Sequence, residues 1–192
     1  MEKLTGLKKN KTAVFISGAG SNLKNLIKFA KIKKSPISID LIVSNTDKAK
    51  GLGFAHQFKI KKQTFNFKNN KVVDKKILLL LKKEKIKLIC LAGFMEILSK
   101  NFIKKFRGKI INIHPSLLPK YKGLNTHYRA IKNKDRFAGC TVHYVNEKLD
   151  SGKIIIQKRV KIAAMDNPDS LAVKVLKQEH KLYLAAILKI FI

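Results

Sequence analysis

The stretch KIINIHPSLLPKYKG, residues 109–123, joins an apolar run to a loop that contains two prolines. Three isoleucines in the run predict a strand from Lys109 to Ile113. Because side chains alternate between the two faces of a strand, Asn112 and His114 point the same way. The predicted strand therefore ends with an amide and an imidazole aimed at one place, beside a loop stiffened by Pro115.

Two interpretations of this pair remain open on the residues alone. In the first, the Asn112 amide donates a hydrogen bond to an oxygen that gains negative charge during a reaction, and His114 transfers a proton near neutral pH. In the second, both side chains are hydrogen-bonded parts of a loop with no chemical role. Ser17 and Ser116 are possible nucleophiles, but neither lies in a G-x-S-x-G setting, so an acyl-enzyme mechanism is disfavoured.

The rest of the chain alternates between short apolar runs and amphipathic segments. Strands are predicted at Thr12–Ser17, Ser38–Ser44, Ile86–Ala92, Lys109–Ile113, Cys140–Val145 and Lys153–Ile162. Helices are predicted at residues 22–31, 50–58, 70–85, within 93–106, at 125–134 and at 171–190. This alternation predicts an α/β fold with a mainly parallel sheet, an antiparallel hairpin at one edge and a long C-terminal helix. The length suits a single domain, residues 1–192.

Ligands of such sheets bind at the carboxyl ends of the strands. The segment ISGAGSN, residues 16–22, follows the first predicted strand. Its glycines permit close backbone approach, and the amides of the following helix favour an anion. Leu23 stands where a dinucleotide motif has its third glycine, so one phosphate is expected instead of a pyrophosphate. A tight turn capped by Ser21 or Asn22 is the alternative.

Asp150 lies in the turn NEKLDSG between the last two predicted strands, in a chain with only 12 acidic residues. Its carboxylate either orients His114 and holds it protonated, or completes a plain Asp-Ser-Gly turn. His143 lies on a strand and is expected to be structural. His127 is interpreted as a helix cap or a substrate contact. The histidine spacing is not that of metal ligands, so no metal is expected.

The chain carries 42 lysines and arginines against 12 acidic residues, a formal net charge of +30. Such a charge attracts polyanions and anionic small molecules. However, only four of these basic residues are arginine, the residue on which nucleic-acid readers depend. The lysines are spread along the whole chain, as coding bias in an AT-rich genome would produce. Nucleic-acid binding is therefore not expected, and a nonenzymatic polyanion-binding protein remains an alternative.

Apolar runs such as Ile77–Leu81 are far too short to cross a bilayer, and the N-terminus lacks the pattern of a signal peptide. Cys90 and Cys140 are the only cysteines, and their separation fits neither a zinc site nor a disulfide framework. A reduced, cytoplasmic protein without a membrane partner is expected.

Four segments together resemble the phosphoribosylglycinamide formyltransferase family of folate-dependent enzymes: FISGAGSNLKNLI, LAGFMEILS, INIHPSLLPKYKGLNTHYRAI and GCTVHYVNEKLDSGKIIIQKRV. The resemblance extends from residue 12 to about residue 184. The Asn-Ile-His and Ser-Leu-Leu-Pro pattern is shared with methionyl-tRNA formyltransferase and formyltetrahydrofolate deformylase, which carry a further domain for which 192 residues leave no room. The resemblance implies a Rossmann-like formyltransferase fold that occupies the whole chain.

The resemblance also implies a reaction. The formyl group of the cosubstrate 10-formyltetrahydrofolate passes to the primary amine of glycinamide ribonucleotide, a step of purine biosynthesis. By this resemblance, Asn112 stabilises the oxyanion, His114 donates and shuttles the proton, and Asp150 sustains the protonation of His114. A hydrolase that releases formate to water is the nearest alternative. The protein is expected to act as a monomer or homodimer.

Binding residues follow from the same resemblance. The phosphate and ribose of the ribonucleotide are expected at Ala19, Gly20, Ser21, Asn22 and Glu179. The folate is expected at Phe94, Met95, Ile97, Leu98, Asn112 and Val145. Four positions depart from the family pattern: Glu96 stands where better-known members have arginine, Asn125 replaces a common histidine, Lys122 a common proline and Leu176 a glutamine. The anionic tail of the folate would then need other cations, for which Lys68 or Lys71 is suggested.

Overall fold

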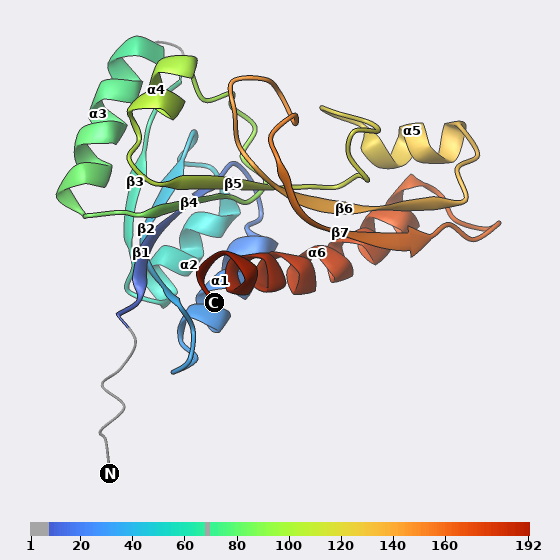
Figure 1. Ribbon diagram of the computed structural model, residues 1–192, viewed down its shortest axis with the longest axis horizontal. Helices are drawn as coiled ribbons and strands as arrows, with labels where there is room; N and C mark the ends of the chain where they lie inside the picture. The colour runs from blue at the N-terminus through green and yellow to red at the C-terminus, as the bar shows by residue number, and fades with distance from the viewer. Residues whose placement is uncertain (1–7, 68–69) are drawn as a thin grey trace.

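The computed structural model of the protein describes residues 8–67 and 70–192. Its strands are β1 (Asn10–Ile16), β2 (Ile37–Ser44), β3 (Lys61–Thr64), β4 (Leu88–Leu91), β5 (Lys109–His114), β6 (Phe137–Tyr144) and β7 (Ile154–Lys161). Its α-helices are α1 (Ser21–Ala30), α2 (Gly53–Gln57), α3 (Asn70–Lys83), α4 (Lys100–Lys105), α5 (Thr126–Lys132) and α6 (Pro168–Phe191). The strands form one sheet in the order β3-β2-β1-β4-β5-β6-β7 (Figure 1).

The sheet confirms the predicted fold class. Strands β1 to β5 run parallel, whereas β6 is antiparallel to β5 and β7 is antiparallel to β6. The last two strands therefore form the expected antiparallel hairpin at one edge, and α6 is the expected long C-terminal helix. No helix in residues 8–67 and 70–192 is long and apolar enough to span a membrane.

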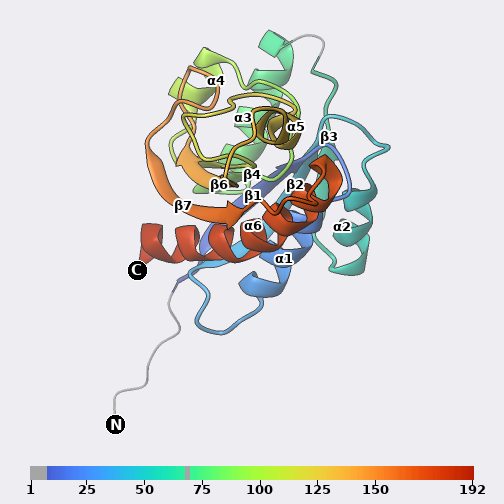
Figure 2. The same ribbon diagram turned by 90° about the vertical axis from the view of Figure 1, so that its right-hand side faces the viewer.

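Helices cover both faces of the sheet because its central strands are apolar on both sides. On β1, Ala13 and Phe15 belong to a core cluster with α3 and α4, whereas Val14 and Ile16 belong to a cluster with α1, α2 and α6. Figures 1 and 2 show these two helix layers on opposite faces. Alternation along a strand thus assigns each residue to one layer.

The strand order creates a crevice at the carboxyl ends of β1 and β4. Strand β1 lies between β2 and β4, so the connections that follow β1 and β4 depart to opposite faces of the sheet. Such a switch in direction leaves room for a ligand between the two loops. Because β6 is antiparallel to β5, its end lies beside the start of β5, and the turn from there to β7 reaches back so that its residues face the same crevice.

Three sequence predictions need correction. Strand β3 was not predicted, because its residues KKQT show no apolar alternation and only pairing with β2 defines it. The helix predicted within residues 93–106 occupies only Lys100–Lys105, since the Ser99 side chain caps it by accepting the Phe102 amide. The helix predicted at 50–58 is a 3-10 turn followed by the short α2. Other predicted bounds differ by a few residues.

Helix α6 links the hairpin to the parallel strands. It begins with a capping box between Asn167 and Ser170 and contacts both β6 and β7. Further along the helix, the fully buried Tyr183 hydroxyl lies 2.9 Å from the Leu91 carbonyl of β4 and 3.3 Å from the Ile111 carbonyl of β5. The Tyr183 hydroxyl of α6 thus donates to a carbonyl of the sheet at the boundary between two adjacent strands.

We expect Tyr183→Phe to lower the free energy of unfolding by about 1–2 kcal/mol, because it removes a buried hydroxyl that donates to a strand carbonyl. Urea denaturation followed by circular dichroism measures this change. Tyr128→Phe is the matched control, since that side chain is 55% exposed and its change should stay within about 0.5 kcal/mol. Equal stability of the two variants would show that the Tyr183 hydroxyl contributes nothing.

Candidate active site

A cavity of about 920 Å³ lies at the carboxyl ends of the parallel strands. The loops after β1, β4 and β5 line it, together with the turn between β6 and β7 and the start of α6. Every residue singled out as a site residue from the sequence lines this cavity: Ala19, Gly20, Ser21, Asn22, Phe94, Met95, Ile97, Leu98, Asn112, His114, Val145, Asp150 and Glu179. The fold thus brings five separate sequence segments together around one space.

Strand β5 presents Asn112 and His114 to the cavity. Ile111 and Ile113, which alternate with them, pack into the core beneath α6, so the amide and the imidazole lie on the opposite face of the sheet. His114 is buried and Asn112 is half-buried. The strand continues one residue beyond the predicted end, which makes His114 its last residue.

The Asp150 carboxylate is the meeting point of the site. Its Oδ2 accepts a 2.9 Å hydrogen bond from the Gly123 amide and lies 3.4 Å from His114 Nδ1. Its Oδ1 lies 3.5 Å from Asn112 Nδ2 and 3.6 Å from His143 Nε2. Asp150 therefore does more than complete a turn: it connects the loop after β5 with the turn between β6 and β7.

Opposing influences act on the protonation of His114. Its Nε2 lies 2.9 Å from the Tyr121 carbonyl oxygen, an acceptor, so Nε2 carries a proton. Burial lowers the pKa of His114, and although the Tyr121 carbonyl and the Asp150 carboxylate act in the other direction, the pKa stays below its ordinary value. A protonated His114 is accordingly a stronger acid than a free imidazolium.

Asp150 itself is held ionised. Burial disfavours its charge, but the Gly123 amide, which donates to it, and the neighbouring His114 ring lower its pKa below the ordinary value. An ionised carboxylate next to His114 partly offsets the effect of burial on that imidazole. Of these two influences on the pKa of His114, burial is the larger.

His143 lines the cavity, a position that the sequence did not predict for this histidine, which was expected to be structural. It is 2% exposed and lies directly opposite Asn112 in the antiparallel pairing of β5 and β6. Its Nε2 is 3.3 Å from Asn112 Nδ2. The signal that identifies it is the strand register, which pairs Asn112 with His143 and which no local sequence pattern reveals.

The other end of the cavity combines a glycine turn with a buried acid. Gly20 has a left-handed backbone, φ 74°, just before α1, and a Cβ there would lie 2.8 Å from the Gly51 Cα. Asn22 Nδ2 donates to Glu179 Oε2 at 2.8 Å, and burial raises the pKa of Glu179. The Asn22 Oδ1 atom is buried and, among the described residues, has no hydrogen-bond partner.

The loop after β4 supplies an apolar wall. Met95 and Ile97 are 63% and 67% exposed, whereas Leu98 is buried and the Phe94 ring packs edge-on against Phe15. Large apolar side chains that stay exposed beside a cavity are suited to a flat aromatic ligand. The Met95 amide donates to Ser17 Oγ, which ties this loop to the loop after β1.

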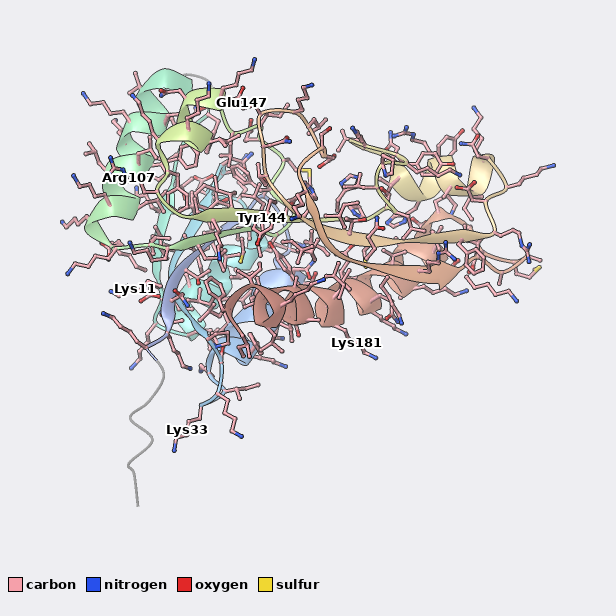
Figure 3. The ribbon with its side chains drawn as sticks, viewed as in Figure 1. Lys11, Lys33, Arg107, Tyr144, Glu147 and Lys181 are labelled. Carbon is pink, nitrogen blue, oxygen red and sulfur yellow. The ribbon has the colours of Figure 1, made fainter. Side chains whose placement is uncertain are left out.

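The cavity is acidic although the chain is strongly basic. Its lining contains five carboxylates, whereas Lys148 is the only lysine or arginine among the described residues that line it. Glu96 accepts a 2.8 Å hydrogen bond from Asn45 Nδ2 and has no ion pair among the residues that the structure describes. In Figure 3, by contrast, lysines such as Lys33 and Lys181 extend outward from the molecule.

Two further sequence predictions concern the cavity wall. His127 is not the cap of α5, because Asn125 holds that position; instead His127 lines the cavity, and burial lowers its pKa. Lys68, suggested as a partner for an anionic tail, lies outside the described residues, as does the side chain of Lys71. In the part of the chain that is described, no three potential metal-ligating side chains cluster together.

Several known proteins are similar to this chain in sequence. The formyl transferase family matches residues 10–187. Phosphoribosylglycinamide formyltransferase of Haemophilus influenzae is 43% identical over 176 residues, which cover 90% of this chain and 83% of that protein. The human trifunctional purine biosynthetic protein adenosine-3 is 42% identical over 183 residues, but these represent 94% of this chain and 18% of that protein.

Solved structures agree with these relatives. Phosphoribosylglycinamide formyltransferase from Brucella melitensis superposes with a TM-score of 0.90 at 42% identity, covering 95% of this chain and 96% of that one. The corresponding protein from Bacillus halodurans gives 0.89 at 32% identity, with coverages of 94% and 95%. The chain therefore belongs to the formyl transferase family.

Proposed function

We propose that the protein transfers the formyl group of 10-formyltetrahydrofolate to the amine of glycinamide ribonucleotide, as a single formyltransferase domain. The observation that carries this proposal is the convergence of Asn112, His114 and Asp150 in one cavity with a glycine turn at one end and an apolar wall at the other. The relatives named phosphoribosylglycinamide formyltransferase support the same substrate pair.

The amine of the ribonucleotide attacks the formyl carbon, and the carbonyl oxygen gains negative charge as the carbon becomes tetrahedral. An Asn112 Nδ2–H then donates to this oxyanion. A well-placed donor of this kind is worth about 3 kcal/mol of barrier height, because it strengthens as the charge develops. The partial burial of Asn112 adds to its effect, since little water competes for the oxygen.

Collapse of the intermediate breaks the bond between the formyl carbon and N10 of the folate, and N10 needs a proton in order to leave. His114 supplies this proton, and the attacking amine gives up one proton in exchange, directly or through water. Burial favours release of the proton from His114, whereas Asp150 keeps enough of the imidazole protonated for the reaction to proceed. The products are the formylated ribonucleotide and tetrahydrofolate.

Each substrate has a matching end of the cavity. The amides at the start of α1, after Gly20, are suited to the phosphate of the ribonucleotide, and Glu179 is placed to accept hydrogen bonds from ribose hydroxyls. Met95 and Ile97 are suited to the flat pterin ring. The reacting amine and formyl group then meet near Asn112.

We expect Asn112→Ala and His114→Ala each to lower kcat by about 100-fold or more, since each removes a group that acts on the developing charge or on the transferred proton. Release of tetrahydrofolate from 10-formyltetrahydrofolate, with and without glycinamide ribonucleotide, measures the reaction. Release that needs no ribonucleotide would identify a hydrolase, and no release at all would leave a binding protein.

Asn101→Ala and His56→Ala are matched controls, because both side chains are exposed and neither lines the cavity. Circular dichroism and thermal melting should show all four variants folded. Near-normal kcat in either cavity variant would contradict the proposed mechanism.

Asp150→Asn should also change the pH dependence of the reaction. The carboxylate raises the pKa of His114, so its removal lowers that pKa further. Because the reaction needs protonated His114, kcat/KM falls as the pH rises through this pKa. The fall is therefore expected at lower pH in Asp150→Asn than in the wild type.

A pH–rate profile of both proteins tests this shift. Asp47→Asn removes the same charge from an exposed loop outside the cavity and should leave the profile unchanged. A shift toward higher pH in Asp150→Asn would contradict the role of His114 as the acid.

A further inference from the structure

We propose that His143 is a positioning residue that determines which way the Asn112 carboxamide is turned. This inference rests on the proposed function, because it concerns how the oxyanion donor is presented to the substrate. His143 Nε2 lies 3.3 Å from Asn112 Nδ2, and both residues lie on adjacent antiparallel strands in direct register.

The hydrogen bonds of His143 assign its tautomer. Its Nδ1 lies 2.8 Å from the backbone carbonyl oxygen of Tyr144, whose position at the end of β6 is labelled in Figure 3. A carbonyl oxygen only accepts, so Nδ1 carries the proton. In the neutral ring, Nε2 then has a free lone pair, and this lone pair accepts an N–H from Asn112.

Asp150 is the other polar neighbour of His143 Nε2. The Nε2 atom lies 3.6 Å from Asp150 Oδ1, which is longer than a hydrogen bond, and 3.3 Å from the Asn112 amide nitrogen. The geometry therefore pairs Nε2 with the Asn112 amide. The second ring nitrogen is committed to the backbone, so the imidazole is held at both ends.

Both neighbours of the amide nitrogen are acceptors. Besides His143 Nε2, Asp150 Oδ1 lies 3.5 Å from Asn112 Nδ2. If the carboxamide turned over, its own oxygen would face a carboxylate oxygen and an imidazole lone pair, which repel it. His143 and Asp150 together thus select one of the two orientations of the side chain.

This selection matters because the two ends of a carboxamide have opposite effects on an oxyanion. The NH₂ group stabilises the charge, whereas the oxygen repels it. An amide that turned freely would spend part of its time in the repelling orientation and would need to reorganise before each turnover. His143 removes that alternative before the substrate binds by holding one N–H, and the other N–H, whose contact with Asp150 Oδ1 is long at 3.5 Å, turns to the oxyanion.

Two amide replacements separate the two hydrogen bonds of the imidazole. His143→Gln places a carbonyl oxygen near the former Nε2 and keeps an acceptor for Asn112, whereas His143→Asn reaches only the former Nδ1 and keeps the bond to Tyr144. His143→Leu keeps the volume but neither bond.

The rate of tetrahydrofolate release gives kcat and the KM of each substrate. We expect kcat to fall about tenfold or more in the Asn and Leu variants, with both KM values little changed. His143→Gln is expected to recover most of the rate.

A double-mutant cycle separates positioning from general support of the fold. In an Asn112→Ala background the amide is gone, so His143→Leu should change kcat by less than about threefold. His56→Leu, at an exposed position outside the cavity, is the control for the His-to-Leu change. A similar loss in the Gln and Asn variants, or a full additional loss in the Asn112→Ala background, would overturn the inference.

The orientation of the amide is also measurable without turnover. Nuclear magnetic resonance of the Asn112 side-chain NH₂ group in the wild type is expected to show slowed hydrogen exchange that His143→Leu accelerates and His143→Gln preserves. Equal exchange in all three proteins would overturn the inference. If the wild-type protein released no tetrahydrofolate with the ribonucleotide, the proposed function would fail, and this measurement would still decide the role of His143.

Discussion

The hydrogen bond from the Gly123 amide to the Asp150 carboxylate joins two loops on which the whole site depends. One loop follows β5 and carries the Tyr121 carbonyl that holds His114; the other is the turn between β6 and β7. Several residues of these loops have left-handed backbones that the free chain disfavours, Tyr121, Asn125 and Asp150 among them. An ionised carboxylate that accepts a backbone N–H offsets part of that cost.

The basic surface and the acidic cavity have different effects on an anionic ligand. Lysines that extend from the surface raise the concentration of anions near the molecule over distances of about 10 Å at moderate salt. The cavity wall, with its five carboxylates, does not itself attract anions. A ligand must therefore be held by directed groups, such as the amides at the start of α1 and the side chains around Asn112, and not by charge alone.

Much of the fold follows from residues that are close in sequence. The apolar runs identify six of the seven strands, and the face shared by Asn112 and His114 follows from simple alternation on β5. Two features escape such reasoning because they depend on distant partners. Strand β3 exists through its pairing with β2, and the position of His143 at the site depends on the register of β5 against β6.

The segment after β4 escapes prediction for another reason. Its residues have a helical pattern, but the Met95 amide bonds to Ser17 and the Ser99 side chain caps the following helix, so tertiary contacts override local preference. Two of the apolar side chains that the pattern would bury in a helix face then remain exposed at the cavity. In this loop, tertiary hydrogen bonds thus outweigh the local preference for a helix.

The left-handed backbone at Asp150, φ 45°, bears on how this position can vary. Glycine, asparagine and aspartate adopt such a conformation most readily, whereas other side chains are strained there. A residue at position 150 must therefore meet two requirements: it must adopt the left-handed backbone, and it must carry a negative charge beside His114. Under the proposed mechanism, in which the Asp150 charge supports His114, aspartate alone meets both requirements, because glycine and asparagine lack the charge and glutamate is poorly suited to the left-handed backbone. Few substitutions at this position would therefore keep both the fold and the activity.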